Sequence, residues 1–345
     1  MSVQTVVLSA LVGLGSLLWL SLNSKSKAKR TVSNKTVVII GASSGIGKET
    51  ALEFARLGAN LLLVARREAE LLEVEKQCME INPSIKVRIL SADITRTEEV
   101  SKIHSVLASF KQNEEVSKDG KSQSDITTTA SSTTKDSKVS NQDTDTVPVD
   151  FLILNAGIIS VQTVTAMVLD DKNPSFMESS LDHIMQVNFF APVKLCNLLL
   201  PNIVACSGSI SVVSSMGGLL PAPTRSLYCA SKAAVILYFG SLRLELERLG
   251  VSVSIICPGT VNTNLRNSAV DLPPSSTTST TSSPSTIPGS TTGKASPEYS
   301  AKVIIDAATS NKPLVLFPFK YKVAYTLYPF FSGFIDKMAK KKYGF

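Results

Sequence analysis

The stretch Thr36–Thr50 constrains the fold more than any other part of the chain. It reads T-V-V-I-I-G-A-S-S-G-I-G-K-E-T, so an apolar β-branched run breaks at Gly41 and glycine recurs at Gly45 and Gly47. This pattern predicts a strand, a tight turn and the first turn of a helix. The free backbone N–H groups and the positive end of such a helix favour a pyrophosphate. On these residues alone, an ordinary glycine-rich turn is an equal alternative.

Apolar strand-like runs alternate with helical patterns along the rest of the chain. Further strands are predicted at Asn60–Val64, Lys86–Leu90, Val149–Leu154, Ser209–Val213, Val251–Cys257 and Pro313–Phe317. The later helices are predicted at Glu68–Ile81, Thr97–Phe110, Ser180–Leu200, Leu227–Leu249 and Pro297–Ala308. The alternation predicts an α/β fold with a single doubly wound parallel sheet and helices on both faces. In such a fold, ligands bind beyond the carboxyl ends of the strands.

Two segments interrupt this pattern within a predicted domain at residues 36–318. Residues 111–146 are rich in Ser, Thr, Asp and Lys, and residues 267–296 are rich in Ser, Thr and Pro. Such compositions bury too little apolar surface to offset the entropy of ordering, so we expect two disordered inserts. The first insert follows a helix and should lie away from the ligand-binding edge. The second follows a strand and should lie over the mouth of the site.

The N-terminal residues Thr5–Leu22 carry no charge and are nearly all apolar. As a helix they are about long enough to cross the roughly 30 Å hydrocarbon core of a bilayer. We therefore expect an uncleaved transmembrane helix; a cleaved signal peptide is the alternative, but it lacks a basic leader and a small-x-small cleavage site. The basic residues follow the apolar run, which predicts that the main domain faces the cytosol. They are Lys25, Lys27, Lys29 and Arg30.

The net charge of +7 and the isoelectric point near 9.1 indicate an anionic partner. The basic residues gather after the apolar run and in the tail at residues 319–345, and they do not alternate with aromatic residues in a compact stripe. This distribution favours a membrane surface over nucleic acid. The tail also holds many Tyr and Phe residues, which predicts a membrane-associated helix. A terminal helix that covers the core or a dimer face is an equal alternative.

The five cysteines are odd in number, widely spaced and free of any C-x-x-C or metal-ligand pattern. With two histidines in the chain, we expect no metal site. Reduced and mostly packed thiols are predicted, which is typical of a reducing compartment. The cysteines are Cys78, Cys196, Cys206, Cys229 and Cys257.

Three residues form a candidate reaction centre. Tyr228 and Lys232 are four residues apart on a predicted helix, so both side chains lie on one face. An ammonium near a phenol favours the phenolate and is expected to lower the tyrosine pKa. Ser215 ends a strand at the ligand-binding edge, where its hydroxyl is able to bind a carbonyl oxygen. Together they suit general acid catalysis of carbonyl reduction, or the reverse reaction.

Several short motifs in this order resemble the short-chain dehydrogenase/reductase family. They span about Thr36–Asn264, apart from the first insert, and comprise G-A-S-S-G-I-G at Gly41–Gly47, N-A-G at Asn155–Gly157, Asn188, S-S at Ser214–Ser215, Y-C-A-S-K at Tyr228–Lys232 and P-G at Pro258–Gly259. The resemblance implies a Rossmann-type domain. One departure is Leu154, where the family usually has a first asparagine before N-A-G.

The resemblance also implies roles for single residues. Tyr228 is expected to be the catalytic acid/base and Ser215 to polarise the substrate carbonyl. Lys232 would bind the nicotinamide ribose and lower the tyrosine pKa, and Asn188 would hold a water in a proton relay. Asn155 and Ile46 would line the cofactor cleft, and Asp93 would meet the adenine. The expected cofactor-binding residues are Gly41, Ser43, Ser44, Gly45, Ile46, Gly47, Arg66, Asp93, Asn155, Ala156, Gly157, Tyr228, Lys232, Pro258 and Gly259.

The end of the second strand favours NADP over NAD. An NAD site usually has a carboxylate there to hold the ribose 2′-hydroxyl. This chain has Ala65 followed by Arg66 and Arg67. We expect Arg66 to pair with a 2′-phosphate and Ser43 to donate a hydrogen bond to it. The alternative is that both arginines are solvated surface residues.

The N-terminal anchor, P-G-T-V-N-T-N-L and the helix S-P-E-Y-S-A-K-V-I are similar to the membrane-anchored member-seven branch of the family. The expected function is therefore hydride transfer between NADP(H) and a carbonyl or alcohol of a hydrophobic substrate such as a steroid or retinoid. The endoplasmic reticulum is the expected membrane, and family members commonly pair as homodimers. The alternative is a catalytically silent membrane scaffold or nucleotide-sensing protein.

Overall fold

The computed structural model describes residues 28–110, 146–170, 175–271 and 294–345, and in these ranges seven strands form one parallel sheet. The sheet order is β3-β2-β1-β4-β5-β6-β7. Its direction of progression reverses between β1 and β4, which opens a crevice at their carboxyl ends. The strands are β1 Thr36–Ile40, β2 Asn60–Ala65, β3 Val87–Ser91, β4 Phe151–Leu154, β5 Ser209–Val213, β6 Ser252–Pro258 and β7 Leu314–Phe317.

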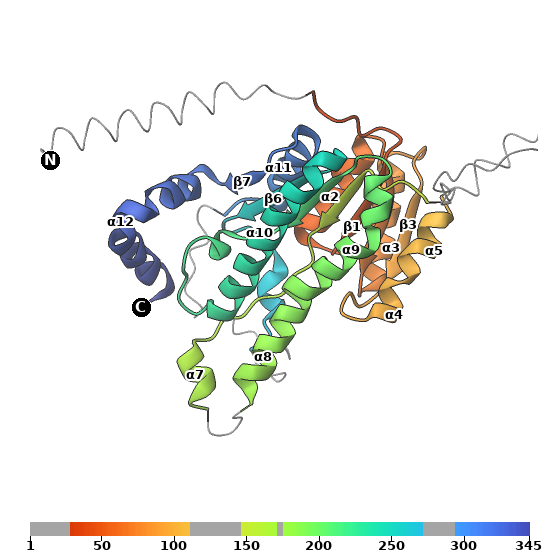
Figure 1. Cartoon of the computed structure of the whole chain (residues 1–345). Helices are drawn as coiled ribbons and strands as arrows, with labels where there is room; N and C mark the ends of the chain where they lie inside the picture. The colour runs from red at the N-terminus through yellow and green to blue at the C-terminus, as the bar shows by residue number, and fades with distance from the viewer. Residues whose placement is uncertain (1–27, 111–145, 171–174, 272–293) are drawn as a thin grey trace, which may run out of the picture.

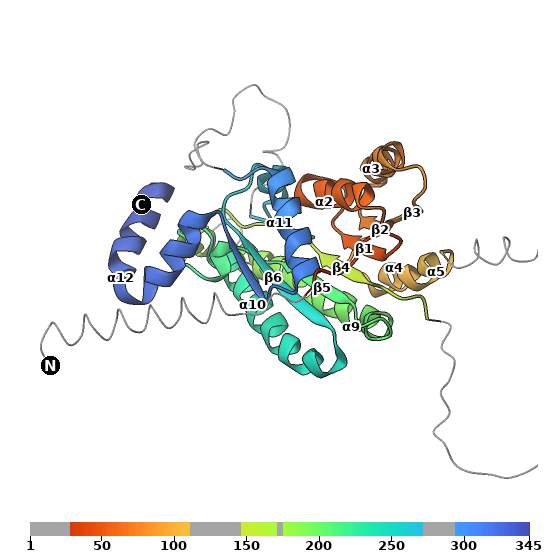
Figure 2. The same ribbon diagram turned by 90° about the horizontal axis from the view of Figure 1, so that it is seen from above.

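Helices cover both faces of the sheet, as Figures 1 and 2 show, and the doubly wound α/β prediction is confirmed. One apolar core lies between the sheet and the helices α2 Gly45–Arg56, α3 Glu68–Ile81 and α11 Pro297–Ser310. The opposite core is covered by α5 Lys102–Ala108, α8 Phe176–Met185, α9 Ala191–Val204 and α10 Ser226–Leu246. The central strands β4 and β5 are buried along their whole length, which explains why β4 reads as a continuous apolar run and β5 carries only small polar residues among its apolar ones.

The helix predicted at Ser180–Leu200 is longer and is interrupted. A π-helical turn at Gln186–Phe190 joins α8 to α9 and contains Asn188. Such turns occur mostly as single bulges in α-helices and are frequent at functional sites. In the described part of the chain, the helical runs Phe176–Val204 and Ser226–Leu249 are long and apolar enough to cross a membrane. Both pack against the sheet.

Two further helical regions differ from the prediction. The helix predicted at Thr97–Phe110 is split into α4 Thr97–Val100 and α5, which meet at Ser101. A short helix, α7 Val164–Val168, was not predicted, and a Thr163 side chain caps it by accepting a hydrogen bond from the backbone of Ala166. These differences lie outside the strand pattern and leave the sheet order unaffected.

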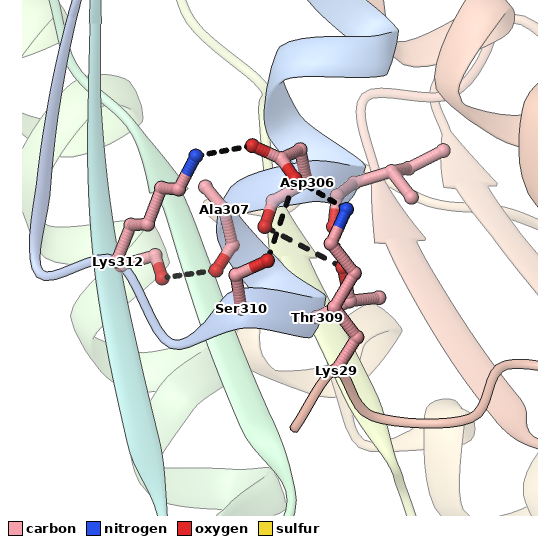
Figure 3. Close-up of polar contacts among 8 residues, drawn as sticks. Lys29, Asp306, Ala307, Thr309, Ser310 and Lys312 are labelled. Carbon is pink, nitrogen blue, oxygen red and sulfur yellow. Dashed lines mark hydrogen bonds and ion pairs between the residues drawn. The ribbon is translucent and has the colours of Figure 1, made fainter. Parts of the chain in front are cut away.

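Polar contacts fasten the segment before β1 to the amino ends of the strands (Figure 3). Lys29 forms an ion pair with Asp306 at 2.8 Å, and Lys312 binds the same carboxylate. The Arg30 guanidinium donates to the Asn311 side chain and to the backbone oxygens of Ser207 and Gly250. Asn311 precedes β7, Ser207 precedes β5 and Gly250 precedes β6. Two of the four basic residues that were interpreted as a membrane flank are therefore bound to the domain.

The C-terminal tail forms α12 Phe319–Tyr343, which projects beyond the edge of the sheet in both Figure 1 and Figure 2. Pro329 interrupts its hydrogen bonds, and the chain kinks at Phe331. No residue of α12 is fully buried, and Tyr321 in its first turn packs against the core. The helix therefore covers the core at its start, and membrane association and a dimer face stay predictions. The exposed large side chains of α12 are Phe319, Val323, Tyr325, Leu327, Phe330, Phe331, Phe334 and Met338.

The second predicted insert begins later than its sequence suggested. Residues 267–271 and 294–296, predicted as disordered, are ordered: Val270 donates to the Ile159 backbone, and Ala295 donates to the Thr260 backbone. The apolar residues Ala269 and Val270 are able to pack, and the Ser/Thr/Pro-rich composition starts only after them. Residues 272–293, the predicted anchor at 5–22 and residues 111–145 of the first insert lie outside the described residues.

Candidate active site

The turn between β1 and α2 has the geometry of a phosphate-binding loop. Gly41 and Gly45 have φ angles of 85° and 56°, which favour glycine. A Cβ on Gly47 would lie 2.0 Å from the Gly41 carbonyl oxygen, so no larger residue fits there. The Asn155 side chain donates to that same oxygen at 3.1 Å and joins the end of β4 to the turn. The turn is therefore held in a fixed shape at the N-terminus of α2, which suits a pyrophosphate.

The two arginines after β2 point to different partners. Arg67 donates to the hydroxyl oxygens of Ser43 at 2.9 Å and Ser44 at 2.8 Å. Arg66, which was expected to lie beside Ser43, instead has its charge near Asp93. Arg67 precedes the first residue of α3, and the extended backbone there turns its side chain back toward the glycine-rich turn. Arg67 is thus the arginine that contacts the glycine-rich turn, and it also forms an ion pair with Glu70 at 3.3 Å. The pairing of Arg66 with a 2′-phosphate stays a prediction.

Asp93 follows β3 at the same edge of the sheet. Its carboxylate accepts hydrogen bonds from the backbone and hydroxyl of Thr95. Burial raises its pKa, but these hydrogen bonds and the charges of Arg66 and Arg96 together hold the pKa below its usual value. The ionised Asp93 carboxylate is thus held by an Asx-type turn at the edge of the crevice, next to the position expected for the adenine.

Asn188, Gly157 and Lys232 converge behind the cofactor crevice. The Asn188 side chain accepts from the Ile158 N–H at 2.8 Å and donates to the Ile158 oxygen and to Ser231. A Cβ on Gly157 would lie 3.2 Å from the Lys232 nitrogen and 3.3 Å from the Asn188 oxygen. The π-helical turn brings Asn188 into this position. Its side chain fixes the loop after β4, and the expected water relay through Asn188 stays a prediction.

Tyr228 and Ser215 lie together at the start of α10 and the end of β5. A Cβ on Gly217 would lie 3.5 Å from both the Ser215 hydroxyl oxygen and the Tyr228 ring. The Ser215 oxygen accepts a hydrogen bond from the Gly217 N–H at 3.1 Å, which leaves its own hydroxyl proton to be donated. Burial raises the pKa of Tyr228 to about 12, and the hydrogen bond with Ser215 opposes this shift.

Lys232 is buried and lies near Tyr228, with its nitrogen 5.9 Å from the centre of the tyrosine ring. The nitrogen donates to the Val213 backbone oxygen at 3.0 Å. Burial lowers the Lys232 pKa to about 8, so its ammonium form predominates at pH 7. The net shift of the Tyr228 pKa is upward, because burial of the phenol is the largest effect. A lowering contribution from Lys232 stays a prediction.

The carboxyl end of β6 closes the site from the other side. Pro258 ends the strand, and the Gly259 N–H donates to the Phe317 oxygen of β7 at 2.7 Å. A Cβ on Gly259 would lie 2.1 Å from the Tyr321 ring, so this glycine allows α12 to pack against the strand end. Thr263 lies beside the turn, since a Cβ on Gly45 would be 3.1 Å from its methyl group. Sequence reasoning missed Tyr321 and Thr263.

The structure thus brings the predicted site residues to one edge of the sheet. Those of the glycine-rich turn follow β1, Asp93 follows β3, Asn155 to Gly157 follow β4, and Ser215 follows β5. Ile46 and Ala156 are half-buried beside the crevice. The donors and glycines fit a dinucleotide along β1 and β4, with the reacting groups at the β5 and α10 end.

Comparison with known proteins identifies the family. The short chain dehydrogenase family model matches residues 35–114 and 104–272. Dehydrogenase/reductase SDR family member 7B from Danio rerio is 31% identical over 74% of this chain and 70% of its own length. 11-beta-hydroxysteroid dehydrogenase-like 4A from Arabidopsis thaliana is 32% identical over 69% of this chain and 66% of its own. The chain belongs to the short-chain dehydrogenase/reductase family and is an oxidoreductase of that class.

Solved structures share the fold at lower sequence identity. A short-chain dehydrogenase/reductase from Burkholderia phymatum in complex with NAD has a TM-score of 0.62 and 18% identity, with 86% of this chain and 94% of that chain covered. A short chain dehydrogenase from Burkholderia cenocepacia in complex with NADP has a TM-score of 0.59 and 18% identity, with 90% and 99% covered. A nicotinamide dinucleotide, NAD or NADP, is therefore the cofactor of this class.

Proposed function

We propose that this chain is an NADP(H)-dependent oxidoreductase that interconverts a carbonyl and an alcohol on a hydrophobic, lipid-like substrate such as a steroid or retinoid. The observation that carries the cofactor choice is the contact of Arg67 with Ser43 and Ser44. Ala65 ends β2, so no carboxylate there opposes a 2′-phosphate. The relative named for 11-beta-hydroxysteroid dehydrogenase supports the steroid-like choice.

The residues around Tyr228 suit proton transfer to a carbonyl oxygen. A phenol with a pKa near 12 stays protonated at neutral pH and is able to donate. The Ser215 hydroxyl supplies a second hydrogen bond to the same oxygen, which stabilises the developing charge. Lys232 is charged at neutral pH and lies close enough to stabilise the phenolate that remains. When bound, the nicotinamide supplies or accepts the hydride.

Replacement of Arg67 tests the cofactor choice. We expect Arg67→Ala to lower the ratio of NADPH to NADH affinity by roughly tenfold or more, because a charge-assisted hydrogen bond is worth about 1.5–3 kcal/mol. Arg66→Ala is the matched control from the adjacent position and should change the ratio less. Cofactor fluorescence titrations measure both affinities. An unchanged ratio in Arg67→Ala, or a larger loss in Arg66→Ala, would contradict the assignment.

We also propose that the chain is a single-pass protein of the endoplasmic reticulum membrane with its domain in the cytosol. Support comes from the uncharged stretch Thr5–Leu22 and from the exposed aromatic side chains and lysines of α12. Carbonate extraction and protease treatment of sealed microsomes test this arrangement on the full chain. The protein should resist extraction, and its domain should be cut from the cytosolic side. Release by carbonate, or protection from the protease, would contradict it.

The alternative of a silent scaffold is less consistent with the site. Ser215, Tyr228 and Lys232 are all present and lie close together, and Lys232 is buried at the cost of its hydration. A protein with no catalytic task has no need of a buried ammonium beside a buried phenol. Consumption of NADPH in a screen of steroid, retinoid and long-chain ketones would support the enzyme, and failure to bind any nucleotide would support the scaffold.

A further inference from the structure

Arg225 lies at the start of α10, three residues before Tyr228, and is only 4% exposed. Arg225 is the N-cap of this helix, and its backbone oxygen accepts a hydrogen bond from the Cys229 N–H in the first turn. Its charge acts on Tyr228 and lowers the pKa of the phenol, so Arg225 is close to the proposed reaction centre. The family motifs do not include it, and the proposed reaction so far gives it no task.

The guanidinium is buried with few partners. Its Nη1 donates to the backbone oxygen and hydroxyl of Thr224, and its centre lies 5.5 Å from the ring of Tyr343. Among the described residues, no carboxylate forms an ion pair with it, and its Nε and Nη2, which are not fully enclosed, have no hydrogen-bond acceptor there. Burial accordingly lowers the pKa of Arg225. A guanidinium near the reaction centre with two unused donors and no direct counterion suits an anion, which indicates that another group completes the site.

The nearby acidic residue is already engaged. Asp271 is fully buried and its charge attracts Arg225, but its carboxylate accepts hydrogen bonds from the backbone N–H groups of Val161 and Gln162. Arg266 adds a second positive charge near Arg225. Arg225 and Arg266 thus share one carboxylate that is already engaged, a balance of charge that favours an additional anion.

The backbone before Arg225 is strained. Thr224 has a φ of 62°, a left-handed conformation that β-branched residues rarely adopt. This conformation lets both oxygens of Thr224 bind the same nitrogen of Arg225. Strain of this kind costs free energy and clusters at ligand-binding positions.

We propose that Arg225 binds an anionic oxygen group, such as a carboxylate, sulfate or phosphate, at one end of an otherwise apolar substrate. Two free donors on a planar guanidinium match two oxygens of such a group. Tyr343 of α12 lies against the guanidinium and closes this end of the site. The inference rests on the proposed carbonyl/alcohol activity and narrows its substrate to amphipathic anions.

The test compares charged and neutral forms of one substrate. The probes are aryl ketones with a terminal carboxylate on a short, medium or long alkyl chain, each paired with its methyl ester, and NADPH oxidation gives kcat/KM. For at least one length the wild-type enzyme should prefer the carboxylate. Arg225→Gln should reduce that preference by roughly tenfold or more. Arg225→Lys should retain part of it, and Arg248→Gln, an exposed position on the same helical region, should retain all of it.

Preference for the ester at every length, or an equal preference in Arg225→Gln, would overturn the inference. A merely structural role in fastening α12 would lower the rates for both probe forms alike, and that result would also overturn it. If Arg225→Gln fails to bind NADPH, wild-type protein decides the question: dodecanoate should compete better than dodecanol with the ketone. If no carbonyl compound is reduced, the proposed function fails. The role of Arg225 is then still decided by dodecanoate binding, which equilibrium dialysis measures on the wild type and on Arg225→Lys.

Discussion

Two sets of charged residues at opposite ends of the parallel sheet are held in opposite ways. At the carboxyl ends, Lys232 and Arg225 are buried, and their hydrogen bonds to the described part of the chain go to backbone or hydroxyl oxygens. At the amino ends, the Lys29, Asp306 and Lys312 cluster is exposed and fully paired. The first arrangement costs stability and suits chemistry; the second adds a little stability and has no chemical task. Substitutions at the two ends should therefore separate activity from stability.

The largest expected effect is on catalysis at the carboxyl end. Tyr228→Phe removes the proton donor and should lower kcat for ketone reduction by about 10²- to 10⁴-fold. Because the phenol is buried and its hydroxyl costs desolvation, the variant should fold with nearly unchanged stability. NADPH oxidation gives the rate, and thermal unfolding gives the stability.

The control for this variant is NADPH affinity, which should stay close to that of the wild type. Retained turnover in Tyr228→Phe would contradict the assignment of the proton donor. A large fall in the unfolding temperature with retained activity would contradict the separation of the two ends.

The glycine-rich turn is the place where this separation should fail, since its geometry serves both folding and binding. Gly47→Ala should lower the free energy of unfolding by about 1–3 kcal/mol, because its Cβ would meet the Gly41 oxygen at 2.0 Å. NADPH affinity should fall as well, since the turn must shift. Gly333→Ala on α12 is the matched control, with no atom within 4 Å of its Cβ. Equal unfolding temperatures for the two variants would show that the turn adapts.

The sequence predicts the cofactor half of the site well because that half is local. Gly41, Gly45 and Gly47 lie within a single turn, and each strand end that faces the crevice follows a readable apolar run. Tyr228 and Lys232 are also four residues apart on one helix. Contacts of this kind follow from helix and strand periodicity alone.

The remaining parts depend on contacts between distant segments. The side-chain direction of Arg67 depends on how α3 begins, so the sequence does not distinguish it from Arg66. The place of Arg225 depends on the left-handed Thr224 and on Tyr343, more than a hundred residues later in the sequence. The predicted direction of the Tyr228 pKa shift differs from the structure for a related reason. Helix periodicity shows that Lys232 is near Tyr228, but it does not show how deeply the phenol is buried.

The smallest expected effect is at the amino end. Hydrogen bonds from Lys29 and then Lys312 lower the Asp306 pKa from 3.8 to about 2. A carboxylate with a lowered pKa stabilises the fold above its unfolded pKa, and this contribution is lost as the pH falls from about 4 toward 2. Since the pairs are exposed, Asp306→Asn should lower the free energy of unfolding at pH 7 by less than about 1 kcal/mol, with kcat unchanged.

Urea unfolding of the wild type and Asp306→Asn at pH 7 and at steps below pH 4 measures this contribution. The difference between their midpoints should narrow as the pH falls, because protonation removes the same charge that the substitution removes. Glu80→Gln, which alters the weaker exposed pair with Lys76 at 4.0 Å, is the control and should show a smaller difference at pH 7. A difference that persists at low pH would assign the effect of Asp306→Asn to packing, and a change in kcat would mean that the two ends of the sheet are coupled.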